Sequence, residues 1–283
     1  MRADARRRIE AATGKTVVRV SPLGGGCVGD VFKIDLAGGD KIVAKIADAN
    51  GKLALEGFML GVLKKAGLPV PEVIRADDDL LLMSWIDGGD AIDESAQIHA
   101  ADLLAALHGR TQADFGFDRA TLIGGLDQPN PRTASWRSFF RDHRLLYMAG
   151  EARRVGNLPA RAMARIETLA ARIERWIEEP PAPSLIHGDM WGGNVLVKGG
   201  RIAGFVDPAI HYADAEIELA FSTLFSTFGD AFFRRYAEHR PIRPGFFEER
   251  RDLLNLYPLL VHVRLFGGAY VQSVERTLAK FGC

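Results

Sequence analysis

Three polar residues in the C-terminal half of the chain have types and spacing that suit chemistry on a phosphate. Asp189 and Asn194 lie in LIHGDMWGGNVLV, and Asp207 follows in FVDPA after a short apolar hairpin. A carboxylate at the start of a loop can accept the proton of an attacking hydroxyl, and Asn and Asp oxygens are hard ligands for the Mg²⁺ of a nucleotide. Any one of these residues alone more often caps a helix or a turn. Together they predict ATP- and Mg²⁺-dependent phosphoryl transfer to a hydroxyl.

The N-terminal region contains a second set of residues with the same chemistry. Lys45 is the one charged residue inside the apolar run IVAKIA, and Glu56 follows on a helical segment. A lysine within such a run is costly unless it is paired or bound to an anion, and a Lys–Glu pair positions the lysine for nucleotide phosphates in kinases. Upstream, a glycine-rich turn lets backbone N–H groups approach phosphate oxygens: Gly24, Gly25, Gly26 and Gly29. The alternative is a plain hairpin turn and a lysine on a solvated face.

Cys27 lies inside this glycine-rich turn. Free N–H groups that favour anions would also stabilise a thiolate, so Cys27 is a candidate for reversible oxidation. The alternative reading, a small residue in a loop, is equally compatible with the sequence.

The order of the predicted elements indicates an α+β protein with two lobes. After an early amphipathic helix, residues 17–84 alternate strand-like runs with turns, interrupted by a helix over residues 52–65, and Asp77–Asp79 form the turn of a hairpin. From Ile86 onward, helical spacing dominates, with helices expected over residues 94–108, 136–150 and 159–178. Residues 121–135 read as a loop that covers a cleft. We therefore predict an N-terminal lobe over residues 1–86 and a C-terminal lobe over residues 87–283.

Composition excludes several classes of protein. Among 283 residues, Lys and Arg total 36 and so do Asp and Glu, so the basic surface of a nucleic-acid-binding or membrane-binding protein is not expected. No apolar run reaches the length of a membrane span, and the N-terminus has no apolar core typical of a secretion signal. The two cysteines give no disulfide framework. We expect a cytoplasmic protein that is a monomer or a homodimer.

The motifs resemble those of the fructosamine kinase (ketosamine-3-kinase) family, within the aminoglycoside and choline kinase-like branch of the protein kinase fold. LIHGDMWGGN is similar to the L-H-G-D-L-W-S-G-N catalytic loop of the family, departing at Met190 and Gly192, and FVDPA resembles its D-P-A segment. LGGGCVGDVF resembles its glycine loop, and SWRSFFRDHRL its W-x-x-F-F-x-x-x-R-L helix. The resemblance covers nearly the whole chain. It implies a protein kinase-like fold with a small antiparallel-sheet lobe and a larger, mainly helical lobe.

The resemblance also implies a role for each matching residue. Asp189 would be the catalytic base, Asn194 and Asp207 the Mg²⁺ ligands, and Lys45, fixed by Glu56, would contact the ATP phosphates. The glycine loop would cover the nucleotide, and the hinge beside adenine would consist of Met83, Ser84, Trp85 and Ile86.

The acceptor implied by the resemblance is a ketosamine, either a small molecule or protein-bound, phosphorylated on its 3-hydroxyl as a step of deglycation. Trp191 would lie near the sugar, with His211 and Glu216 as further candidates, although His211 could simply pack a loop. Glu218 is expected to be a structural anchor, and Phe139 and Phe140 to be helix core.

Two alternatives remain open. One is a kinase for another small hydroxylated amine, such as an aminoglycoside or choline, which would need an acidic pocket; residues 210–283 contain as many Lys and Arg as Asp and Glu. The other is a non-catalytic kinase-like binding module. It is disfavoured because every expected catalytic position holds a chemically competent residue.

Overall fold

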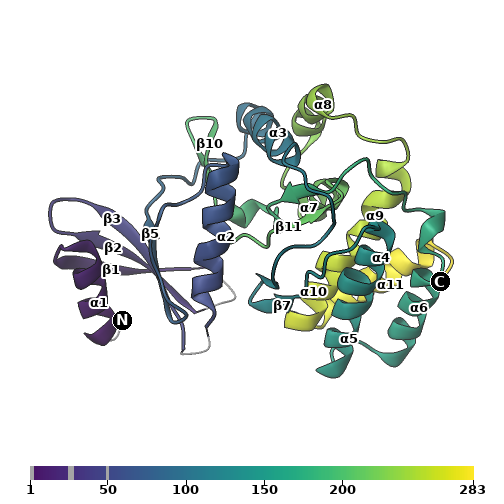
Figure 1. The fold of residues 1–283 in the computed structure, drawn as a ribbon, viewed down its shortest axis with the longest axis horizontal. Helices are drawn as coiled ribbons and strands as arrows, with labels where there is room; N and C mark the ends of the chain where they lie inside the picture. The colour runs from purple at the N-terminus through teal and green to yellow at the C-terminus, as the bar shows by residue number, and fades with distance from the viewer. Residues whose placement is uncertain (1–2, 25–28, 49–50) are drawn as a thin grey trace.

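The N-terminal part is an antiparallel sheet with a helix on each face (Figure 1). The computed structural model describes residues 3–24, 29–48 and 51–283. Five strands pair in the order β1-β2-β3-β5-β4. Their bounds are β1 Val17–Leu23, β2 Asp30–Leu36, β3 Lys41–Ile46, β4 Val73–Ala76 and β5 Leu80–Ser84. Helix α1, Ala3–Thr13, lies on one face of this sheet and α2, Leu53–Ala66, lies on the other.

Successive side chains of a strand point to opposite faces of the sheet, so they pack alternately against α1 and against α2. Leu80 and Leu82 of β5 are buried with Ile9 of α1, whereas Leu81 and Met83 are buried in the cluster that includes α2. In β3, Ala44 faces α1, so Lys45 faces α2. The alternation therefore directs the buried lysine toward the helix that carries Glu56.

The C-terminal part is mainly helical and follows a connector after β5. Its helices are α3 Glu94–His108, α4 Trp136–Phe140, α5 Tyr147–Arg154, α6 Ala160–Ala170, α7 Glu216–Leu224, α8 Asp230–His239, α9 Arg251–Leu254, α10 Leu256–Phe266 and α11 Ala269–Lys280. π-Helical turns over Arg141–Leu146 and Phe246–Arg250 precede α5 and α9, and 3₁₀ turns cover Ile173–Arg175 and Gly192–Asn194. Its short strands pair as β6 Thr121–Ile123 with β7 Leu126–Gln128, β8 Ser184–Ile186 with β11 His211–Ala213, and β9 Val195–Lys198 with β10 Arg201–Phe205. This architecture confirms the predicted α+β kinase-like fold.

Residues 121–135 differ from the expected covering loop. Residues 121–128 form the β6–β7 hairpin, whereas residues 129–135 contain no helix or strand; Thr121, Gln128 and Asn130 are buried. Thr121 Oγ1 donates to the Ile210 carbonyl at 3.0 Å, and the amides of Gln128 and Asn130 each donate to Thr121 Oγ1 at 2.8 Å. The prediction of a loop over residues 121–135 was wrong for residues 121–128, because these hydrogen bonds let polar residues of a hairpin occupy the interior.

The helix predicted over residues 159–178 ends earlier, at Ala170, and a 3₁₀ turn follows. The helix predicted over residues 136–150 is continuous in direction but contains a π-helical turn. Phe139 and Phe140 are fully buried, as expected for core residues. In the described part of the chain, no helix has the length and apolar character needed to cross a membrane.

Candidate active site

The loop between β8 and the turn Gly192–Asn194 presents Asp189. Gly188 precedes it with φ of 88°, and a Cβ at this position would lie 2.1 Å from the Ala209 carbonyl oxygen. Only glycine fits such a left-handed, crowded position. The Gly188 N–H donates to Glu218 Oε1 at 2.6 Å, which fixes the loop to helix α7.

Asp189 and Asn194 contact each other directly. Asn194 Nδ2 donates to the Asp189 carbonyl oxygen at 2.8 Å and to Asp189 Oδ2 at 2.9 Å. Burial raises the pKa of Asp189 to about 7, with the nearby charges of Asp207 and Glu218 adding to the rise and the Asn194 hydrogen bond opposing it. A carboxyl group with a pKa near neutrality is suited to accept a proton.

His187 connects this loop to the segment that leads to Asp207. Its Nε2–H donates to the Val206 carbonyl at 3.0 Å, and its Nδ1 accepts from the Asp189 N–H at 3.3 Å. Burial lowers the pKa of His187, so the ring is neutral, as this pair of hydrogen bonds requires. His187 therefore positions the two loops.

Lys45 joins the N-terminal sheet to Asp207. Its Nζ lies 2.6 Å from Glu56 Oε1 and also forms an ion pair with Asp207 Oδ1. Burial disfavours the charged lysine, but the charges of Glu56 and Asp207 outweigh it, so the pKa of Lys45 is raised and the amine stays protonated. The Lys–Glu pair expected from the sequence is present in the structure.

Asp207 adopts a strained backbone conformation. Its φ is 54°, in the left-handed region that Asp tolerates better than most residues. The side chain is 34% exposed, so its second oxygen can contact a ligand. Backbone strain of this kind is often retained at functional sites, where a side chain must be held in one orientation.

Glu218 anchors the catalytic loop, as the sequence predicts. It is fully buried, and its Oε2 accepts from His108 Nε2 at 2.8 Å, while His108 Nδ1 lies 2.7 Å from the Tyr236 hydroxyl. Burial opposes ionisation of Glu218, but the bonds from His108 and Gly188 lower its pKa. His108 and Tyr236 were not predicted, because nothing in their local sequence links α3 or α8 to this loop.

The structure describes only part of the glycine loop that is predicted to cover ATP. Gly29, with φ of 70°, is packed so that a Cβ would lie 2.5 Å from the Ile46 carbonyl oxygen. Gly24 has open space around it, whereas Gly25, Gly26 and Cys27 lie outside the described residues.

The predicted hinge comprises the last two residues of β5 and the two residues after them. Met83 is buried and Ser84 half-buried, and the Trp85 ring lies under Lys33 Nζ at 4.4 Å and donates to Asp87 at 2.7 Å. Ile86 lies against Gly204 of β10, where a Cβ would meet its Cδ1 at 2.5 Å. This contact brings the hinge next to the hairpin between Asn194 and Asp207.

Trp191 is exposed on the catalytic loop. Its indole lies over Gly193, where an added Cβ would be 2.3 Å from the ring, and it makes an edge contact with Phe225 at 6.4 Å between centroids. Phe225 was not singled out from the sequence, because its position after α7 gives no local signal. The two aromatic rings form an exposed apolar surface next to Asp189.

His211 and Glu216 are placed differently from their expected acceptor role. His211 is buried: it accepts from Arg144 Nε at 3.3 Å and donates to the Ala209 carbonyl at 3.2 Å. Glu216 is buried, with both oxygens accepting from Arg250 at 2.6 and 2.9 Å. Neither can contact an acceptor in this conformation, because packing and ion pairing occupy both side chains.

A half-buried carboxyl base beside an Asn, together with a lysine that bridges a helix Glu and a loop Asp, defines a phosphotransferase of the protein kinase-like class. Known proteins extend this assignment. A probable ketoamine kinase of Synechocystis is 32% identical over 265 residues, covering 90% of this chain and 87% of that protein. A structure provisionally named fructosamine-3-kinase, from Thermobifida fusca, has a TM-score of 0.85 at 29% identity and covers 97% of this chain and 98% of its own.

The family model for fructosamine kinase matches residues 1–281. The chain belongs to the fructosamine kinase family, which confirms the resemblance seen in its motifs and makes it a ketoamine kinase, a phosphotransferase. An aminoglycoside phosphotransferase in ternary complex with ADP and hygromycin B has a TM-score of 0.68 at 16% identity and covers 97% of each chain. At that identity the likeness shows the shared fold.

Proposed function

We propose that this enzyme transfers the γ-phosphoryl group of ATP to the 3-hydroxyl of a ketosamine. The observation that carries the proposal is the Lys45 amine, which joins Glu56 and Asp207 across the two parts of the chain. This arrangement supports a nucleotide site between residues 1–86, the proposed nucleotide-binding lobe, and residues 87–283, the proposed catalytic and acceptor lobe. The ADP bound to the aminoglycoside phosphotransferase of the same fold supports ATP as the donor.

Asp189 is the proposed catalytic base. It would accept the proton of the acceptor hydroxyl as that oxygen bonds to the γ-phosphorus and the bond to the β-phosphate oxygen breaks, which releases ADP. The pKa near 7 supports this role, because the ionised carboxylate is then available at neutral pH and still binds a proton well.

Asn194 and Asp207 are the proposed Mg²⁺ ligands. Since Asn194 Nδ2 faces Asp189, its amide oxygen faces away from the base, and Asp207 is partly exposed. One amide and one carboxylate oxygen fit a cation that keeps several waters and nucleotide oxygens, and the described residues include no cluster of three or more His, Cys, Asp or Glu that would hold a metal alone. When bound, Mg²⁺ would neutralise phosphate charge.

The other ATP contacts follow from position. When ATP binds, phosphate oxygens would replace Asp207 as a partner of the Lys45 amine. Glu56 would stay paired with the amine and hold it in place. Gly24, Gly25, Gly26 and Gly29 would cover the phosphates, and Met83, Ser84, Trp85 and Ile86 would border the adenine.

Oxidation of Cys27, the cytoplasmic location and the monomeric or homodimeric state stay predictions.

A ketosamine is favoured over a polycationic acceptor by the charges near the site. Asp214 and Glu216 pair with Arg243, and Glu216 also pairs with Arg250, so these buried carboxylates are already neutralised. Trp191 offers instead a flat apolar face for sugar carbons and an N–H for a hydroxyl. Phosphorylation of the 3-hydroxyl would destabilise the sugar–amine adduct and free the amine, as in deglycation.

The test is an ATP-consumption assay on fructosyl-, ribulosyl- and erythrulosyl-amines, choline and an aminoglycoside, with mass spectrometry of each product. We expect the highest kcat/KM on a ketosamine. A higher kcat/KM on choline or the aminoglycoside would refute the proposed acceptor class.

A further inference from the structure

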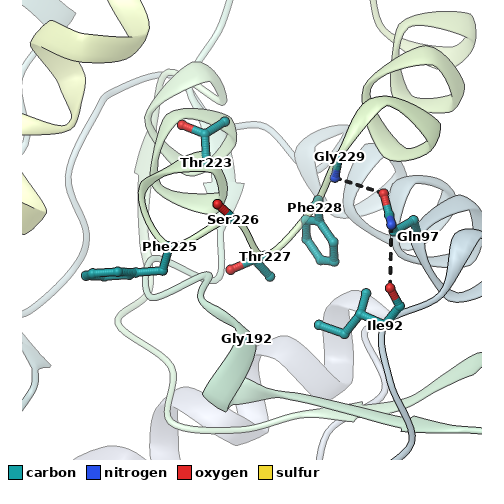
Figure 2. Close-up of a pocket in the computed structure, with 9 residues that line it drawn as sticks. All are labelled: Ile92, Gln97, Gly192, Thr223, Phe225, Ser226, Thr227, Phe228 and Gly229. Carbon is teal, nitrogen blue, oxygen red and sulfur yellow. Dashed lines mark hydrogen bonds between the residues drawn. The ribbon is translucent and has the colours of Figure 1, made fainter.

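A pocket of about 590 Å³ lies beside the catalytic loop (Figure 2). It is bounded by Gly192 of that loop, by the turn between α7 and α8, and by Ile92 and Gln97 at the start of α3. Its volume is within the range of roughly 300–1,000 Å³ typical of small-molecule sites. None of the ATP or metal residues described above lines it.

The pocket adjoins the catalytic loop at the residue after Trp191. Gly192 directly follows Trp191, and a Cβ at Gly192 would meet no atom within 4 Å, so the loop is open toward the pocket. Phe225 lines the pocket and also touches the edge of the Trp191 ring, with an angle of 70° between the two planes. A molecule that lies against Trp191 can therefore extend over Gly192 into the pocket.

The lining is uncharged and partly polar. None of the described residues that line the pocket is Asp, Glu, Lys, Arg or His. Phe228 and Ile92 supply apolar surface and Ser226 carries a hydroxyl, whereas the Phe225 ring points away from Phe228 and Ile92 (Figure 2). Thr227 is 6% exposed, and its Oγ1 has no hydrogen-bond partner. That oxygen is enclosed by protein atoms, so it does not face the pocket.

The chemistry of a ketosamine fixes how far its nitrogen lies from the reacting hydroxyl. Its reacting 3-hydroxyl is on C3, and only C2 and C1 separate C3 from the nitrogen. With that hydroxyl at Asp189 and the sugar on Trp191, the substituent on the nitrogen begins a few atoms from the base. With the nitrogen directed past Trp191, Gly192 would be the first pocket residue that the substituent meets.

We propose that this pocket binds the substituent on the ketosamine nitrogen, and that it selects uncharged, aliphatic or peptide-like substituents. This inference rests on the proposed function, since it assigns a subsite to the same acceptor. The substituent could belong to a free amine or to a glycated lysine within a protein, because both present the same aliphatic chain next to the nitrogen.

Substitution of Ser226 can test whether a charge in the pocket changes which substituent is preferred. Its φ of 55° lies in the left-handed region, which Asn and Asp occupy more readily than other non-glycine residues, so both Ser226→Asp and Ser226→Asn suit the backbone. The two variants are similar in size and shape and differ mainly in charge. Ser226→Asn is therefore the matched control for Ser226→Asp.

The experiment measures kcat/KM of wild type and both variants on three fructosyl-amines, whose nitrogen carries hydrogen only, a butyl group or an aminobutyl group. Wild type should prefer the butyl compound to the other two. Ser226→Asp should raise the ratio of aminobutyl to butyl kcat/KM by about fivefold or more at low salt, and Ser226→Asn should keep the wild-type ratio.

Three results would overturn the inference: no preference of wild type for the butyl compound, an unchanged ratio in Ser226→Asp, or the same change in both variants. If wild type phosphorylates none of the three compounds but does phosphorylate choline or an aminoglycoside, the proposed function fails and the subsite fails with it. Activity on all three compounds with no discrimination leaves the proposed function intact and removes only the subsite.

Discussion

The side-chain amide of Asn194 donates a hydrogen bond of 2.9 Å to Oδ2 of Asp189, so the proposed base and a proposed metal ligand hold each other in place. Asp189 is also desolvated, and its pKa is raised to about 7. An ionised Asp189 in the ligand-free enzyme is therefore a destabilising charge that the active site retains for its chemistry.

The ligand-free enzyme should become more stable when Asp189 loses its charge. A folded-state pKa above the ordinary value of 3.8 means that the carboxyl contributes stability at low pH and loses it as pH rises toward and through 7. The Tm of Asp189→Asn minus that of wild type should thus be smallest near pH 4 and should be about 2–4 °C larger at pH 8.5. Thermal unfolding in EDTA without nucleotide measures this difference.

The exposed Glu167 on α6 supplies a control for this charge effect. Glu167→Gln also removes one carboxylate and should shift the Tm equally at both pH values. A Tm gain of Asp189→Asn that does not grow with pH would contradict the raised pKa.

Asp207→Asn should weaken metal use. The substitution removes an anionic oxygen, so the Mg²⁺ concentration for half-maximal rate and the apparent KM for ATP should both rise, by about tenfold. Asp127→Asn removes a surface carboxylate that pairs with Lys52 at 2.5 Å, and should leave the Mg²⁺ titration unchanged. Equal titration curves for Asp207→Asn and wild type would mean that Asp207 serves the structure alone.

Glu218→Ala should destabilise the fold as well as the site. It leaves the buried Gly188 N–H and the His108 ring without their acceptor, at a cost of about 3 kcal/mol. Denaturant unfolding should show a much smaller loss for Glu218→Gln, whose amide oxygen can still accept from Gly188. The anchor assignment is untenable if Glu218→Ala and wild type unfold at the same denaturant concentration.

Gly193→Ala tests the Trp191 surface by displacing the indole while leaving Trp191 itself unsubstituted. The new Cβ would lie 2.3 Å from the ring, so the indole must move from its contact with Phe225. The KM for a fructosyl-amine should rise about tenfold, while the KM for ATP stays near the wild-type value. Gly150→Ala on α5, where a Cβ meets nothing within 4 Å, controls for the loss of a glycine. Unaltered ketosamine kinetics in Gly193→Ala would remove Trp191 from the acceptor site.

The sequence was sufficient where local pattern controls position. The apolar run around Lys45 and the helix around Glu56 each have a clear period, and strand alternation then directs the lysine to that helix. Asp189 and Asn194 lie five residues apart in one loop, so the hydrogen bond between them is also short-range. These parts of the site depend on short-range geometry, which a single sequence displays.

The sequence was insufficient where distant elements meet. His108 supports Glu218 across a separation of 110 residues, and no local feature of α3 indicates that contact. The ion pairs of Glu216 with Arg243 and Arg250 are similarly long-range, and they turned an expected acceptor ligand into a structural residue. The pocket beside Gly192 also arises only when α3 and the turn after α7 approach the catalytic loop.

The most direct test of the central claim is the position of the phosphate on the product. Wild-type enzyme, ATP and Mg²⁺ are incubated with a fructosyl-amine, and the product is examined by ³¹P–¹H correlation NMR beside the same reaction with Asp189→Asn. The account predicts stoichiometric ADP, a phosphate on the oxygen of C3, and a turnover at least ~10²-fold lower for Asp189→Asn with nearly unchanged nucleotide affinity. Phosphate on another oxygen, or an Asp189→Asn enzyme with wild-type turnover, would contradict it.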